Sequence, residues 1–67
     1  MNFTIEGEWI ELCQLLKACN LCESGGAAKT LIQGGLVLVD GSVEQRRRKK
    51  IYPGQTVLCK DICITTK

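Results

Sequence analysis

The first third of the chain carries hydrophobic residues at the three- and four-residue spacing that is typical of a helix. The side chains that this spacing puts on one face belong to Trp9, Leu12, Cys13, Leu16 and Cys19. Acidic Glu8 and Glu11 stand in the first turn and Lys17 stands near the last, as the helix dipole favours. We therefore predict a helix from Trp9 to Ala18 or Cys19, with Trp9 in the hydrophobic core.

A second, shorter helix is predicted from Gly25 to Gln33. Ser24 precedes it and is a residue type whose side chain accepts a hydrogen bond from the first turn. The pair Gly34-Gly35 follows, and glycine ends many helices because it adopts the left-handed conformation without strain. The inner face of this helix would consist of Ala28, Leu31 and Ile32.

Short segments of apolar and β-branched residues, separated by turn residues, predict strands in the rest of the chain. These segments are Phe3–Ile5, Leu36–Val39, Ser42–Glu44, Thr56–Cys59 and Ile62–Ile64. Asp40-Gly41 is typical of a two-residue hairpin turn, and Pro53-Gly54 marks another tight turn. Together these elements predict an α+β fold in which two packed helices lie against a small, mostly antiparallel β-sheet.

The length of 67 residues corresponds to one domain, so we predict a single domain over residues 1–67. The N-terminus lacks the positive and apolar regions of a signal peptide. No apolar run approaches the ~20 residues needed to span a bilayer. We expect a cytoplasmic, monomeric protein that has no membrane partner.

The cysteines allow two interpretations. Five is an odd number in a chain with no export signal, which argues against a disulfide framework. The pairs Cys19/Cys22 and Cys59/Cys63 have spacings from which a four-thiolate zinc site could form. Reduced cysteines are also frequent as small hydrophobic residues of a core. We predict no metal and no other cofactor, and keep a small zinc-stabilised domain as an alternative.

Residue types that carry catalysis are scarce. The chain has no histidine, which is the commonest general acid or base. Its glycine pairs match neither a phosphate-binding loop nor a dinucleotide-binding fingerprint. A nucleophilic cysteine would have only carboxylates or lysines nearby to activate it. We predict that the protein is not an enzyme.

The net charge is only +2, but the basic residues are distributed unevenly. Five of the nine form one unbroken run, which consists of Arg46, Arg47, Arg48, Lys49 and Lys50. Because the run lies between two predicted turns, we expect strands to hold it in place. Alternate side chains of an extended segment face opposite sides, so the five cations would be divided between two sides unless a turn intervenes. Such a cluster attracts phosphate, with an affinity that falls steeply as salt rises.

The start of the second predicted helix is a candidate for another anion site. Ser24-Gly25-Gly26 would present free backbone N–H groups at the positive end of the helix dipole, with Lys29 one turn further on. A plain N-cap explains the same residues equally well. Three aromatic residues are too few for a platform that stacks single-stranded bases, and only Tyr52 adjoins the basic run. Folded or double-stranded RNA, recognised by its shape and backbone, is therefore the expected partner.

The ordered motifs resemble the RNA-binding domain named for ribosomal small-subunit protein S-four, also called the alpha-L motif. The first motif of that family, LxxLLK, corresponds here to Leu12, Leu15, Leu16 and Lys17. The second, SGGxAKxLIxxGxVxVDG, corresponds to Ser24-Gly25-Gly26, Ala28-Lys29, Leu31-Ile32, Gly35, Val37 and Val39-Asp40-Gly41. The third, RRxKKxxPGxxV, corresponds to Arg46-Arg47, Lys49-Lys50 and Pro53-Gly54. The match covers nearly the whole chain and is similar to the short, stand-alone bacterial members.

The resemblance implies that the two helices and the adjoining hairpin form one face that binds structured RNA of the ribosomal or transfer RNA class. Carried over by position, the residues of that face are Ser24, Gly25, Gly26, Lys29, Gln33, Arg46, Arg47, Lys49 and Lys50. Arg48 stands where many relatives have glycine, which leaves the local turn and the contact of Arg48 with RNA open. The rival hypothesis is a ribosome-associated protein-interaction module, whose basic run would meet an acidic protein surface.

Overall fold

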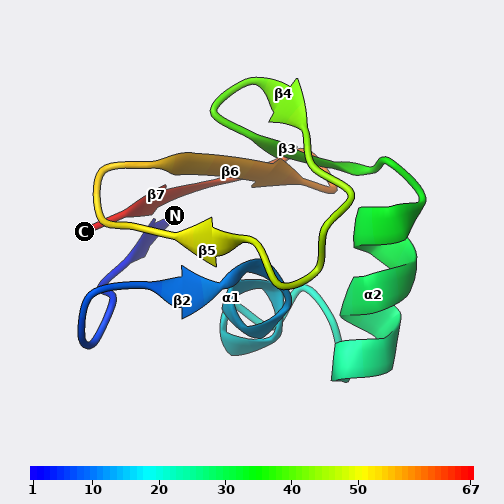
Figure 1. The fold of residues 1–67 in the computed structure, drawn as a ribbon, viewed down its shortest axis with the longest axis horizontal. Coiled ribbons are helices and arrows are strands. Elements are labelled where there is room, and N and C mark those ends of the chain that lie inside the picture. Colours follow the sequence, from blue (N-terminus) through cyan, green and yellow to red (C-terminus); the bar gives the residue numbers. More distant parts are fainter.

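Two helices and seven short strands make up the computed structural model, which describes residues 1–67 (Figure 1). In chain order the elements are β1 (Asn2–Phe3), β2 (Ile10–Glu11), α1 (Leu12–Ala18), α2 (Gly25–Gln33), β3 (Val37–Val39), β4 (Ser42–Val43), β5 (Lys50–Ile51), β6 (Thr56–Cys59) and β7 (Ile62–Thr66). Neither helix is long and apolar enough to cross a membrane. The arrangement confirms the predicted α+β class.

The main sheet contains five strands in the order β1-β7-β6-β3-β4. All neighbours are antiparallel except β1 and β7, which are parallel. Successive residues of β3 face opposite sides, so Val37 and Val39 are buried while Leu38 is half-buried. In Figure 1 both helices lie on one side of this sheet, and the two chain ends lie close to each other.

One hydrophobic core joins the helices to the sheet. Its fully buried large side chains come from both helices and from four of the strands or their ends: Leu12, Leu15, Leu16, Ile32, Ile51, Ile64, Val37, Val57 and Cys59. Ala28 is also fully buried, which lets α1 and α2 approach closely. The two helices therefore pack through buried side chains against the inner face of the sheet.

The elements with strong local signals lie where the sequence predicts them. Helix α2 spans the expected residues, and the Ser24 hydroxyl accepts a hydrogen bond from the Ala27 backbone N–H at 3.2 Å. At the other end of α2, Gly35 has a φ of 78°, in the left-handed region that glycine adopts freely. Strands β3 and β4 form the predicted hairpin, with φ of 50° at Asp40 and 85° at Gly41. This geometry is that of a two-residue turn with both central residues left-handed.

The start of the first helix was predicted wrongly. Helix α1 begins at Leu12, and Ile10–Glu11 form β2 instead of the first turn. Trp9 therefore lies before both elements and keeps 38% of its surface exposed, so its predicted place in the core is wrong. The apolar spacing from Trp9 onward is real, but strand pairing at Ile10 and Glu11 overrides it.

Strand β2 pairs with β5 in a separate two-stranded antiparallel sheet that the sequence does not reveal. Ile10 lies opposite Ile51, and Glu11 lies opposite Lys50. Several strand boundaries also differ from the prediction: β4 ends at Val43 instead of Glu44, and β7 continues to Thr66 instead of ending at Ile64. Strand β1 ends at Phe3, although Ile5 beyond it is buried, and Leu36 lies outside β3 with 63% of its surface exposed. The β2–β5 pair places the basic run directly beside α1.

A polar network links the Asp40-Gly41 turn to the Pro53-Gly54 turn. The two carboxylate oxygens of Asp40 each accept a hydrogen bond at 2.9 Å, one from the Thr56 backbone N–H and one from the Gln55 side-chain amide. The Gln55 Oε1 atom in turn accepts the Tyr52 backbone N–H at 2.7 Å. The Thr66 hydroxyl donates to the Tyr52 carbonyl at 2.7 Å. Both backbone polar groups of Tyr52, the residue after β5, are therefore hydrogen-bonded.

The Asp40 carboxylate makes this network sensitive to acid. The hydrogen bond from the Gln55 side chain, followed by that from the Thr56 backbone, lowers the pKa of Asp40. A group with a lower pKa in the folded state stabilises the fold above its unfolded pKa, and this contribution is lost as the pH falls through the folded value. We expect Tm to fall below about pH 4, and to fall less in the variant Asp40→Asn. Thermal unfolding followed by circular dichroism at a series of pH values gives the dependence of Tm on pH for both proteins. The same dependence in both would contradict the role given to the Asp40 carboxylate.

Candidate functional site

The basic run, Arg46–Lys50, forms a loop that leaves β4 and enters β5. The Lys49 backbone N–H donates to the Arg46 carbonyl at 3.1 Å, which closes a tight turn over Arg47 and Arg48. The flanking strands hold the loop as expected, but the two-sided alternation of an extended segment does not occur because this turn intervenes. Arg48 has no positive φ, so the turn accommodates a residue other than glycine.

The backbone of the loop caps the start of α1. No side chain caps this helix. Instead, the Leu12 N–H donates to the Lys49 carbonyl at 2.9 Å, and the Cys13 N–H donates to the Arg47 carbonyl at 3.0 Å. The first N–H groups of a helix lack partners within the helix, and the loop carbonyls supply them here. The loop is therefore fixed against α1 by its main chain, and its side chains are free to face outward.

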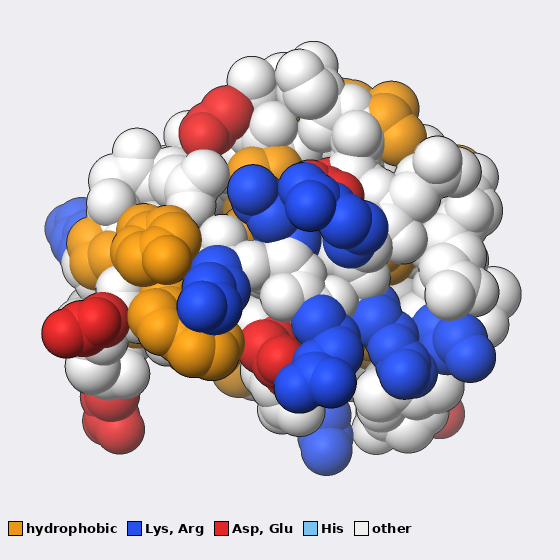
Figure 2. All heavy atoms as spheres, viewed as in Figure 1, with side chains coloured by type: hydrophobic (Ala, Val, Ile, Leu, Met, Phe, Trp, Pro, Cys, Tyr) orange, Lys and Arg blue, Asp and Glu red, His pale blue; other side chains and the backbone are white.

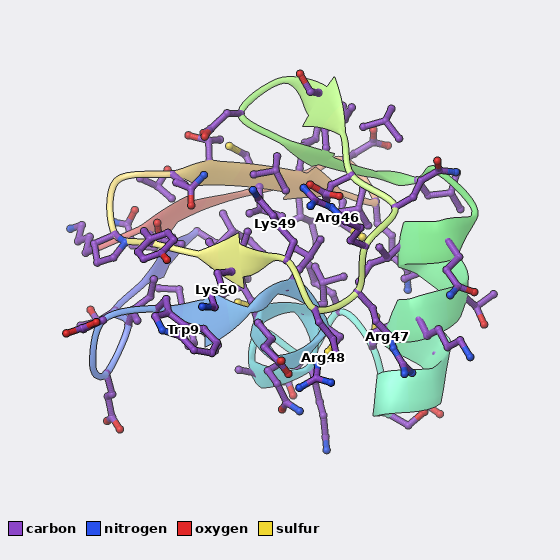
Figure 3. The ribbon with its side chains drawn as sticks, in the orientation of Figure 1. Trp9, Arg46, Arg47, Arg48, Lys49 and Lys50 are labelled. Atoms are coloured by element: carbon purple, nitrogen blue, oxygen red, sulfur yellow. The ribbon has the colours of Figure 1, made fainter.

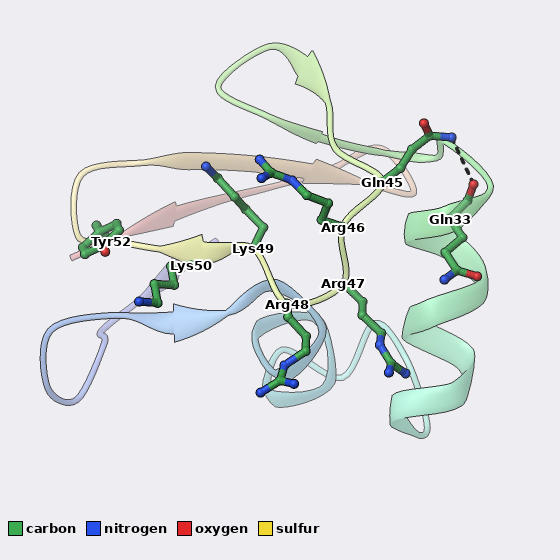
Figure 4. Close-up of a pocket in the computed structure, with 8 residues that line it drawn as sticks. All are labelled: Gln33, Gln45, Arg46, Arg47, Arg48, Lys49, Lys50 and Tyr52. Carbon is green, nitrogen blue, oxygen red and sulfur yellow. Dashed lines mark hydrogen bonds between the residues drawn. The ribbon is translucent and has the colours of Figure 1, made fainter.

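A cavity of about 730 Å³ opens along this loop (Figure 4). Its lining consists of Gln33, Gln45, Arg46, Arg47, Arg48, Lys49, Lys50 and Tyr52. All five cations of the run thus border one space, together with two amides and one aromatic ring. Figure 2 shows Lys and Arg side chains gathered across this face of the molecule. The local concentration of positive charge is far greater than the net charge suggests.

Two of the five cations are paired with carboxylates. Arg46 forms an ion pair with Glu44 at 3.0 Å, with a second hydrogen bond at 3.2 Å. The hydrogen bond from the Arg46 side chain lowers the pKa of Glu44 and raises the pKa of Arg46. Arg48 forms an ion pair with Glu11 at 3.0 Å, and this hydrogen bond raises the pKa of Arg48. Both arginines are about three-quarters exposed, so these pairs orient the guanidinium groups more than they stabilise the fold.

The other three cations have no carboxylate partner. Arg47 and Lys49 make no ion pair, and in Figures 3 and 4 the Arg47 side chain extends toward α2. The Lys50 ammonium lies 4.8 Å from the centre of the Trp9 ring, in a cation–π contact. Arg47 and Lys49 are consequently the cations most available to an external anion.

The predicted residues of α2 are only partly brought to this cavity. Gln33 lines it, and Lys29 is exposed one turn earlier on the same face of the helix. Ser24, Gly25 and Gly26 do not line it and lie at the far, N-terminal end of α2. A Cβ atom at Gly25 would meet nothing within 4 Å, so the fold does not require glycine at this position. The N-terminus of α2 is open, with Ser24 engaged as the cap.

The cysteines do not converge on a metal site. No group of three His, Cys, Asp or Glu residues lies close enough to hold an ion. Cys22 and Cys59 are buried in or beside the core, while Cys63 is exposed on the outer face of the sheet. Burial raises the pKa of the thiols of Cys19, Cys22 and Cys59, which keeps them protonated at neutral pH.

The residues predicted to bind RNA did not include Gln45, Tyr52 or Trp9, although the sequence marked Tyr52 as the one aromatic residue beside the basic run. Gln45 and Tyr52 line the cavity, and their signal was available because they flank the basic run almost directly. Trp9 lies against Lys50 and had no local signal, because only the β2–β5 pairing brings it there.

Comparisons with known proteins agree with this architecture. The family model of the S4 domain matches residues 3–67. YbcJ of Escherichia coli (strain K12), whose name connects it with RNA binding, is 56% identical over 48 residues, which cover 72% of this chain and 69% of YbcJ. RlbA of Bacillus subtilis (strain 168), whose name connects it with ribosome maturation, is 39% identical over 54 residues, covering 81% of this chain and 76% of RlbA.

A solved structure extends the likeness to three dimensions. The solution structure of Escherichia coli YbcJ, described as revealing an alpha-L motif involved in RNA binding, superimposes with a TM-score of 0.74 and 42% identity. The superposition covers 97% of this chain and 84% of that one.

Proposed function

The chain belongs to the S4 domain family, and from this premise we propose that it binds structured RNA without catalysing a reaction. The cavity beside the basic run carries the proposal, because five cations border one space and two of them have no partner of their own. Phosphate is the anion that RNA repeats along its length, so a row of cations matches its backbone and not a single base. The family and the fold shared with YbcJ support the same partner.

We assign the binding surface to two parts. The first is the loop Arg46–Lys50, which faces the cavity. The second is α2, where Gln33 and Lys29 share a face and where Ser24, Gly25 and Gly26 form the start of the helix. Backbone N–H groups at a helix start attract phosphate, and the absence of side chains at the two glycines allows a close approach. RNA of the ribosomal or transfer RNA class has the folded, phosphate-rich surface that would contact both parts.

Several features support a binding role over catalysis. The chain has no histidine. The three thiols whose pKa is raised by burial are poor nucleophiles at neutral pH. One chain forms the whole cavity, so we expect the protein to bind RNA as a monomer. We expect it to do so in the cytoplasm, where ribosomal and transfer RNA are abundant.

A salt titration tests the proposal. We expect binding of a hairpin RNA, measured by fluorescence anisotropy, to weaken steeply with salt, because each phosphate contact releases condensed counterions. Three to five contacts correspond to a slope of log K against log salt of roughly −2 to −4. An affinity that does not depend on salt, or no binding at low salt, would overturn the proposal. Binding that survives only toward an acidic protein, after nuclease treatment, would favour the rival interaction module.

A further inference from the structure

The cavity has an aromatic ring at one end. Tyr52 follows β5, lines the cavity and keeps 46% of its surface exposed. Its neighbour Ile51 is fully buried, so the alternation of the strand directs Tyr52 to the outside. In Figure 4 the Tyr52 ring and Gln33 lie at opposite ends of the cavity, with the basic loop between them. An elongated ligand that follows the cations therefore reaches an aromatic surface.

The Tyr52 ring projects from a fixed piece of main chain. The Tyr52 N–H donates to Gln55 Oε1 and the Tyr52 carbonyl accepts from the Thr66 hydroxyl, both at 2.7 Å. Pro53 follows and restricts the backbone further. The Tyr52 side chain itself makes no hydrogen bond. The backbone of Tyr52 is thus held by hydrogen bonds, and its ring takes no part in them.

A second aromatic residue stands on the other side of Lys50. Figure 3 shows Trp9 beside Lys50, and Figure 2 shows hydrophobic side chains on both sides of a basic one in this part of the same face. A cation–π contact of 4.8 Å places the Lys50 ammonium over the Trp9 ring. Tyr52 and Lys50 both line the cavity, so a nucleotide whose base reaches the Tyr52 ring shares this space with cations that attract its phosphate.

We propose that Tyr52 stacks on an unpaired nucleobase of the bound RNA, at the end of the row of phosphates that contact Arg47 and Lys49. The inference rests on the proposed function and narrows its ligand to a hairpin RNA with an unpaired nucleotide beside the helix. In a fully paired duplex the base faces are covered by their neighbours, whereas a bulged base offers a free face to an aromatic side chain. A cavity of about 730 Å³ is large enough for one nucleotide, since small-ligand sites begin near ~300 Å³.

Two hairpin RNAs that differ only by one unpaired nucleotide in the stem provide the test. We expect the native protein to prefer the bulged RNA by roughly 5- to 100-fold, the range that base–aromatic stacking gives on alanine substitution. Tyr52→Ala should lose this preference but keep its affinity for the paired RNA, while Tyr52→Phe should keep both. Leu36→Ala is the matched control, because it removes another exposed apolar side chain away from the cavity.

A fluorescent base gives a second measurement that does not depend on affinity. When 2-aminopurine occupies the unpaired position, we expect stacking on Tyr52 to quench it in the complex with the native protein but not with Tyr52→Ala. Equal affinity of the native protein for both RNAs, equal losses of Tyr52→Ala on both, or an unquenched probe would overturn the stacking site alone. Failure to bind either RNA would instead overturn the proposed function.

Discussion

Replacing Arg47 and Lys49 together by glutamine is expected to weaken the binding of hairpin RNA about 100-fold at ~0.1 M salt. Each phosphate contact is worth roughly a factor of ten between ~1 M and ~0.1 M salt, because one condensed counterion is released per contact. These two cations have no carboxylate partner in the free protein, so their full charge is available to phosphate. The charges of Arg46 and Arg48 are partly neutralised by Glu44 and Glu11. Replacing these two arginines together by glutamine should therefore weaken RNA binding less.

A matched control distinguishes the effect of the cavity's own charges on RNA affinity from the effect of the net charge. Lys17→Gln with Lys67→Gln removes the same two charges from positions that do not line the cavity. This control should change affinity less than about threefold and leave the salt slope almost unchanged, whereas the site variant should lower the slope by roughly 1.8, or about 0.9 for each lost contact. Similar losses in both double variants would mean that net charge, not this surface, drives binding.

Ile51→Ala is expected to destabilise the protein by about 2–5 kcal/mol, the range for truncating a large buried aliphatic side chain. Ile51 is fully buried and lies opposite Ile10 in the β2–β5 pair, so the change opens a cavity between the small sheet and the core. A chain of 67 residues has a total stability of only about 3–10 kcal/mol. The substitution is thus expected to remove a large part of the free energy of unfolding.

Urea unfolding followed by circular dichroism measures this loss. Val43→Ala serves as the control, since Val43 is 56% exposed and its truncation should change the free energy of unfolding by less than about 0.5 kcal/mol. A loss below about 1 kcal/mol for Ile51→Ala would show that β5, and with it the end of the basic loop, is not supported by the core.

The predictions from the sequence succeed where the signal is local. Helix α2 is marked by a serine cap and a terminal glycine pair, and the β3–β4 hairpin is marked by Asp40-Gly41. Both signals act over a few residues, so no distant contact can easily override them. The family resemblance joined these elements into the alpha-L arrangement, which the structure and the comparisons confirm.

The predictions fail where distant segments pair. The helical spacing that begins at Trp9 gives no sign that Ile10 and Glu11 will pair with Ile51 and Lys50. That pairing starts α1 later than predicted and leaves Trp9 exposed beside Lys50. Short strands are especially hard to recognise, because two residues carry almost no periodicity.

The candidate site divides in the same way. A contiguous run of five cations is visible in any sequence, so the basic part of the surface could be predicted. The ion pair of Arg48 with Glu11 could not be predicted, because it joins two segments that are far apart in the sequence and come together only in the fold. The cavity, and the position of the Tyr52 ring at its end, depend on the same long-range packing.

The hydrogen bonds from Leu12 and Cys13 to the loop carbonyls have a consequence for how tightly the surface can bind. Loops that order only when a ligand arrives lose conformational entropy at that moment, which weakens the complex. Here the main chain of the loop is immobilised during folding, as the partner of a helix end. Because of this pre-organisation, only the long side chains of the cations lose conformational entropy when RNA binds, which favours a tighter complex.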